Sequence, residues 1–184
     1  MIRDPRDVVV SGYFYHLWTD EEWAHRPGGR AWGGLSYHDY LNSVDRHRGL
    51  LAEIERSAAS NLADMAAWDY GQPEFLELHY EDVIDDELSW FSRIFEFYGL
   101  DDEAVSVGLA AVARFSIRSR PTSPDTGNSR QHVRSGRSGQ WRGEFGPDHV
   151  EEFKALTGDL LVRLGYESSQ DWSCEPPDDD AATS

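Results

Sequence analysis

Three short stretches of this 184-residue sequence combine residue types that bind anions or aromatic rings. The first begins at Arg3, just ahead of an Asp-Pro pair that is typical of a helix start, and it continues to Ser11. A helix start presents unpaired backbone amides and a partial positive charge, and the arginine adds a forked donor. The sequence therefore predicts an anion site at Arg3 and Ser11, or else only a well-capped helix with a surface arginine.

The second stretch is an arginine-rich segment between residues 114 and 142. It holds seven arginines and one acid, a local charge of +6 in a chain whose formal charge is -17. In residues 134–142, Arg-Ser-Gly-Arg-Ser-Gly-Gln-Trp-Arg, two glycines let backbone amides turn toward a bound group. This pattern favours phosphate recognition, and a flexible surface loop is the alternative. An RNA-binding patch would use the same arginines, but the charge of -23 on the rest of the chain argues against nucleic acid.

The third stretch surrounds Tyr80, at the end of residues 74–80, whose apolar and polar side chains alternate as in a strand. Ligands of open α/β sheets bind beyond the carboxyl ends of strands, which makes Tyr80 a candidate ligand contact. The alternative is that Glu81 and Asp82 only cap the following helix and that Tyr80 packs at a rim.

Other kinds of chemistry are disfavoured by what the sequence lacks. The single cysteine, Cys174, excludes an intrachain disulfide and cysteine-based metal sites, and the seven histidines show no metal-binding spacing. We therefore expect no metal, and no catalytic residue is identified. No apolar run approaches the ~18 residues that a membrane span needs, and the first residues hold no apolar signal segment. A soluble, cytoplasmic protein without a membrane span is expected.

The rest of the sequence predicts mainly helices around an irregular loop at residues 20–35. The expected helices cover residues 5–17, a long stretch 36–68 interrupted at Gly49 and at residues 57–61, residues 87–98 ended by Gly99, a helix from Asp101 or Asp102 to Ala113, and residues 147–164.

Taken in order, the three stretches resemble the motifs of the sulfotransferase family, whose members use 3′-phosphoadenosine-5′-phosphosulfate (PAPS). The resemblance implies that Arg3 and Ser11 bind the 3′-phosphate and that Tyr80 lies against the adenine. It also implies that an aromatic or apolar side chain covers the purine, either Phe115 or Ile117.

The late loop resembles the family's nucleotide clamp, with a serine where the family has a lysine. The residues implied as nucleotide ligands there are Arg134, Ser135 and Gly136. The loss of the lysine removes one charge, whereas the backbone amides and the Arg134 side chain remain available to the nucleotide.

The resemblance also implies the fold. The family has an α/β three-layer domain like that of the P-loop NTPases, with a parallel sheet. Residues 1–166 are expected to form the helix-rich, N-terminally truncated part of such a domain, and residues 167–184 an acidic, disordered tail.

The family's catalytic His and the Lys that steadies the leaving phosphate lie upstream of the Arg3 motif, and His16 does not match the His by motif position. We therefore expect a protein of the sulfuryl-transfer class, from PAPS to a hydroxyl or amine of a small-molecule acceptor, with adenosine 3′,5′-bisphosphate as product. This chain would supply the 3′-phosphate and adenine half of the site and be inactive alone. Either Met1 is an internal start of a full enzyme, or the chain is a true truncated member.

A different class of function stays open. The chain would then be a non-catalytic nucleotide-binding module or a protein-interaction fragment, with the aromatic surface near Trp18, Trp23 and Trp32 meeting a partner. Apolar surface exposed by truncation would favour a homo-oligomer.

Overall fold

The computed structural model describes residues 1–28, 30–116 and 137–174. The chain divides into two compact units. The first unit comprises Met1–Asp4 and Trp68–Ser138, and the second comprises Pro5–Ala67 and Gly139–Ser184. The described residues hold helices and two isolated β-bridges, and no helix among them is long and apolar enough to cross a membrane.

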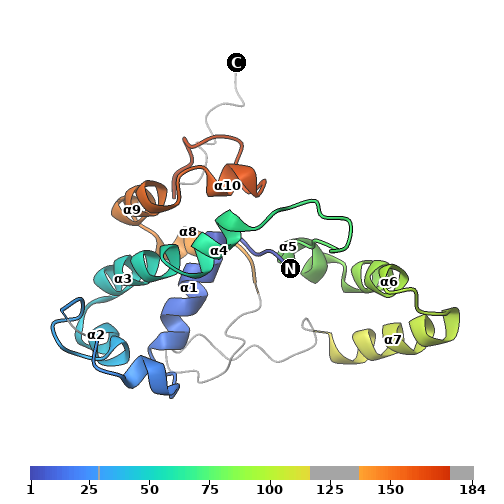
Figure 1. Ribbon diagram of the computed structural model, residues 1–184, viewed down its shortest axis with the longest axis horizontal. Coiled ribbons are helices and arrows are strands. Elements are labelled where there is room, and N and C mark those ends of the chain that lie inside the picture. The colour runs from blue at the N-terminus through green and yellow to red at the C-terminus, as the bar shows by residue number, and fades with distance from the viewer. Residues whose placement is uncertain (29, 117–136, 175–184) are drawn as a thin grey trace. The chain divides into compact units, whose positions relative to one another are not determined.

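The second unit is built around helix α3. Its elements are α1 (Pro5–His16), a 3₁₀ turn η1 (Glu22–His25), α2 (Tyr37–Ser43), α3 (Arg46–Ala58), α4 (Asn61–Ala67), α8 (Trp141–Glu144), α9 (Pro147–Thr157) and α10 (Leu160–Arg163). Helix α3 packs against α1 and α9 (Figure 1), and Leu50 and Ile54 on it are fully buried. The predicted start of α1 at Pro5 is confirmed, because proline needs no hydrogen-bond acceptor for its nitrogen at that position.

The long helical stretch predicted over residues 36–68 is three helices. The break near residue 60 is confirmed, but a break at Gly49 is wrong. The chain instead leaves the helix at Val44, and the Asp45 side chain accepts a hydrogen bond from the Arg48 amide at 2.9 Å to start α3. Gly49 serves close packing, because a Cβ there would lie 2.5 Å from the Tyr13 ring.

The last predicted helix, residues 147–164, is also divided. Helix α9 ends at Thr157 because Gly158 adopts a left-handed backbone with φ of 58°, and α10 follows from Leu160. Leu160 and Leu161 are buried, as the hydrophobic pattern predicts, although the single long helix is wrong.

The first unit contains α5 (Tyr80–Asp85), α6 (Glu87–Phe97) and α7 (Asp102–Phe115). Helix α6 packs against α5 and α7, and α6 and α7 run side by side (Figure 1). The stop at Gly99 is confirmed, with φ of 69°. Asp101 caps α7 by accepting from the Ala104 amide at 2.9 Å, and α7 ends at Phe115, two residues beyond the predicted end.

The strand predicted over residues 74–80 is wrong. Only His79 pairs, in a parallel bridge with Ile2: the Ile2 amide donates to the Leu78 carbonyl and the Tyr80 amide to the Ile2 carbonyl, both at 2.7 Å. A strand forms only where a second extended segment accepts its hydrogen bonds, and among the described residues that segment is a short one around Ile2. The expected helix-rich architecture is present, whereas the parallel sheet of the expected α/β three-layer fold is not shown by the described residues.

Candidate functional site

In the first unit, the start of the chain lies against the Tyr80 segment. The parallel bridge at Ile2 places the Arg3 guanidinium carbon 4.9 Å from the centre of the Tyr80 ring. Next to it, the Asp4 amide donates to the Glu81 carboxylate at 3.1 Å. Two site residues that are 77 positions apart in the sequence are therefore in contact, in a cation–π arrangement.

The Arg3 side chain is only partly satisfied. Its Nε is buried and has no hydrogen-bond partner among the described residues. A buried donor without an acceptor costs about 1–3 kcal/mol. An anionic oxygen bound at Arg3 would remove that cost, so the geometry fits the predicted phosphate ligand.

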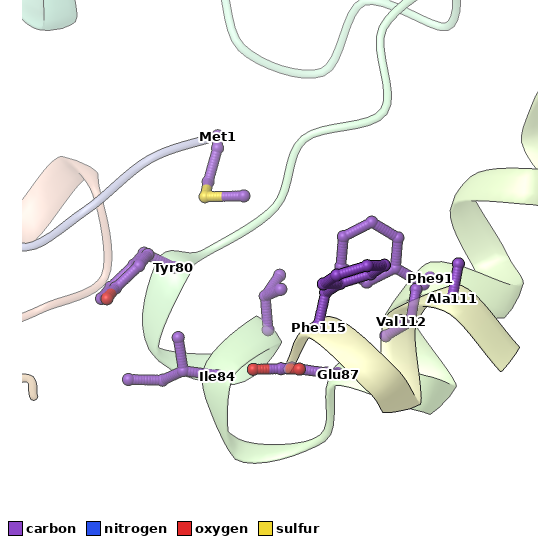
Figure 2. Close-up of a pocket in the computed structure, with 9 residues that line it drawn as sticks. Met1, Tyr80, Ile84, Glu87, Phe91, Ala111, Val112 and Phe115 are labelled. Carbon is purple, nitrogen blue, oxygen red and sulfur yellow. The ribbon is translucent and has the colours of Figure 1, made fainter. Parts of the chain in front are cut away.

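A pocket of about 410 Å³ opens beside Tyr80 in the first unit. Figure 2 shows its walls, which come from α5, α6 and α7 and include Tyr80, Ile84, Glu87, Phe91 and Phe115. Phe115 is 65% exposed at the end of α7, so much of its ring is accessible to a ligand. A volume of this size, with mostly apolar walls and few polar groups, is typical of a small-molecule site.

The structure thus brings together three of the predicted nucleotide ligands, Arg3, Tyr80 and Phe115. Ser11 lies exposed on α1 in the second unit. The other four predicted ligands lie outside the described residues: Ile117, Arg134, Ser135 and Gly136. For all of these residues the role in nucleotide binding stays a prediction.

In the second unit, the first stretch contacts the end of the arginine-rich stretch through a residue that the sequence alone did not point to. Asp7, only 1% exposed, accepts hydrogen bonds from the backbone amides of Gly139 and Trp141, at 2.6 and 3.0 Å. Both amides belong to the end of the 134–142 loop. Asp7 therefore holds that end of the loop against the first turn of α1.

Arg6, next to Asp7, also contacts residues from the C-terminal part of the second unit. It is 2% exposed, stacks on the Trp141 ring at 3.8 Å and on the Trp172 ring at 4.8 Å, and forms an ion pair with Glu167. Within the predicted tail, Glu167 and Trp172 thus contact Arg6 in the second unit, and residues 175–184 lie outside the described residues. In the sequence, the one indication that Arg6 and Asp7 are buried is their position directly before three valines.

A second cluster of polar side chains in the second unit is centred on Glu53 of α3. Glu53 is 2% exposed. Its carboxylate accepts hydrogen bonds from Tyr37 at 2.5 Å and Ser57 at 3.2 Å, and lies 2.8 Å from His16 Nδ1. Burial, together with the Glu53 charge, raises the pKa of Tyr37 far above its usual 10.0, so this hydroxyl stays a donor. This is where His16 lies: its ring is bound to Glu53 within the second unit.

The described residues hold no group of three or more His, Cys, Asp or Glu side chains that could bind a metal ion. The site combines an arginine with a partly aromatic pocket. This arrangement suits a ligand that has an anionic group and a flat ring.

Comparison with known proteins identifies the class. Residues 1–165 match the model of the sulfotransferase domain, and the chain belongs to that family. It is similar to sulfotransferase 2A1 of Mus musculus, with 25% identity over 162 residues, which are 83% of this chain and 52% of the mouse protein. The chain therefore spans about half the length of the curated relative it matches. No solved structure matches it.

Proposed function

We propose that this chain binds the 3′-phosphate and adenine of PAPS, or of its product adenosine 3′,5′-bisphosphate, for sulfuryl transfer to a hydroxyl or amine of a small cytoplasmic acceptor. The observation that carries the proposal is the contact of Arg3 with Tyr80 beside a pocket that Phe115 also lines. Family membership supports the choice of this nucleotide over other ligands with a phosphate and a ring.

Each of the three residues has a distinct part in the proposed binding. Arg3 donates to the 3′-phosphate, and its buried Nε gains an acceptor there. Tyr80 and Phe115 contact the purine, and stacking of a base on an aromatic side chain is worth about 1–3 kcal/mol. Ser11 and the loop residues Arg134, Ser135 and Gly136 are proposed as further ligands by resemblance to the family motifs.

PAPS, when bound, supplies the sulfuryl group. In the family's motif order the catalytic His and the phosphosulfate Lys stand ahead of the Arg3 motif. We therefore expect the 184 residues by themselves to bind nucleotide without transferring sulfate. Transfer from PAPS by the purified chain that Arg3→Ala abolishes would contradict this half-site role.

The binding proposal is tested by calorimetric titration of the chain with adenosine 3′,5′-bisphosphate. Arg3→Ala is expected to weaken binding about 10- to 100-fold, the loss that follows from removing a charge-assisted hydrogen bond. The matched control is Arg48→Ala, which removes the same charge from an exposed position on α3 in the second unit. Equal loss in both variants would mean that only net charge matters, and no binding by the folded wild type would remove the proposal.

A second candidate is a protein-interaction or homo-oligomeric fragment. It is favoured by helices α6 and α7, neither of which has a fully buried residue, and by the exposure of Tyr98 (73%) and Val107 (67%). Apolar surface of this kind is typical of a contact face. Sedimentation velocity of wild type and Val107→Glu separates the candidates: a concentration-dependent dimer that the variant abolishes supports the contact face, and a monomer argues against self-association.

A further inference from the structure

One lining residue of the pocket in the first unit differs in chemistry from its neighbours. The walls are apolar apart from Tyr80 and Glu87. Glu87 is the first residue of α6, and it is partly buried. In Figure 2 its carboxylate lies between Ile84 of α5 and Phe115 of α7. A carboxylate at the wall of a mostly apolar pocket is a strong hydrogen-bond acceptor for whatever occupies that pocket.

The position of Glu87 is held by the local backbone. Asp86 caps α6 by accepting from the Ser89 amide at 3.1 Å, which fixes the first helical turn. Helix α6 in turn packs between α5 and α7, which carry the other pocket walls. The carboxylate therefore projects from a helix rather than from a loop, and a side chain held in this way can select between ligands more precisely.

Charge orients a nucleotide at this pocket. Four further acids stand within six residues of Glu87 along α5 and its cap: Glu81, Asp82, Asp85 and Asp86. Phosphate groups are repelled from this side. Two arginines contact aromatic residues of the pocket wall: Arg3 lies over the Tyr80 ring and Arg114 over the Phe115 ring. They offer cations to the phosphates away from these acids, so we expect the base rather than a phosphate to face Glu87.

We propose that Glu87 accepts a hydrogen bond from the 6-amino group of the bound adenine and so selects for a purine that carries this donor. The inference rests on the proposed nucleotide function. A carboxylate offers about four acceptor positions, so an existing partner of Glu87 does not prevent this bond. A site built to bind an N–H group discriminates against an analogue that lacks it, because the acceptor position that faces the analogue then makes no hydrogen bond to it.

The test compares two probes, adenosine 3′,5′-bisphosphate and purine riboside 3′,5′-bisphosphate, which lacks the 6-amino group. Their affinities for the full 184-residue chain are measured by calorimetric titration. The wild type is expected to prefer the adenosine compound at least about tenfold, the value of one charge-assisted hydrogen bond. Glu87→Leu is expected to reduce this preference to about one, and Glu87→Gln, which keeps an uncharged acceptor, to an intermediate value.

Glu103→Gln is the matched control, because Glu103 lies in the first turn of α7, is exposed and does not line the pocket. It should keep the wild-type preference. Equal affinity of the wild type for the two probes, or a preference that survives Glu87→Leu, overturns the role of Glu87 while leaving nucleotide binding intact. Failure of the wild type to bind either probe overturns the proposed function itself.

Discussion

Replacing Asp7 by alanine tests how the end of the arginine-rich loop is held. The Asp7 carboxylate is buried and accepts from two backbone amides, those of Gly139 and Trp141. Alanine removes both acceptors, so the buried Trp141 amide and the partly buried Gly139 amide lose their hydrogen bonds to Asp7. Asp7→Asn keeps one oxygen but turns an N–H₂ group toward the second amide, so it should be intermediate.

The expected size follows from these two bonds. Leaving a buried donor unpaired costs about 1–3 kcal/mol, so Asp7→Ala should lower the free energy of unfolding by about 2–6 kcal/mol. That is a large share of the roughly 5–15 kcal/mol by which a domain is stable. With a urea m-value of about 2 kcal/mol/M, the unfolding midpoint should fall by about 1–3 M.

Urea denaturation followed by circular dichroism measures this effect. The matched control is Asp64→Ala, an exposed acid in the first turn of α4, just as Asp7 is in the first turn of α1. The control should change stability by less than about 0.5 kcal/mol. If Asp7→Ala behaves like this control, the two amides find other partners and the anchoring argument is wrong.

Three further predictions concern the second unit. Gly12→Ala places a Cβ 2.7 Å from the Glu53 carboxylate, so it should destabilise by about 1–3 kcal/mol in thermal melts, although alanine normally favours a helix. Tyr37→Phe removes a 2.5 Å hydrogen bond to buried Glu53 and should cost about 1–3 kcal/mol in urea; no change would mean that Glu53 is solvated. Burial lowers the pKa of His149 below 6.5, and its Nδ1 accepts from the Gly146 amide at 2.8 Å. The contribution of neutral His149 to the free energy of unfolding should therefore be complete above pH 6.5 and decrease as the pH falls toward the folded-state pKa, a dependence that His149→Gln removes.

Helix starts and stops were largely readable from the sequence because they depend on local chemistry. Pro5 opens α1, Asp101 caps α7, and Gly99 ends the preceding helix through a left-handed backbone. The errors came where the local signal was ambiguous: Gly49 resembles a helix breaker, but it lies inside α3 because the Tyr13 ring occupies the space of a side chain.

The sequence by itself determined the order of three anion-binding or aromatic motifs, their resemblance to the sulfotransferase family, and a chain with a basic island in a strongly acidic background. These properties depend on residue type and spacing alone. Family membership is confirmed by the match over residues 1–165.

Only the tertiary structure decided which of these residues meet. The parallel bridge at Ile2 brings Arg3 to Tyr80, and the packing of α5, α6 and α7 adds Phe115 and Glu87 to one pocket. Such contacts join positions far apart in the chain, and no local preference encodes them. The same reason explains why the buried role of Asp7 was not foreseen: a carboxylate at a helix start looks like a surface residue until distant backbone amides are folded against it.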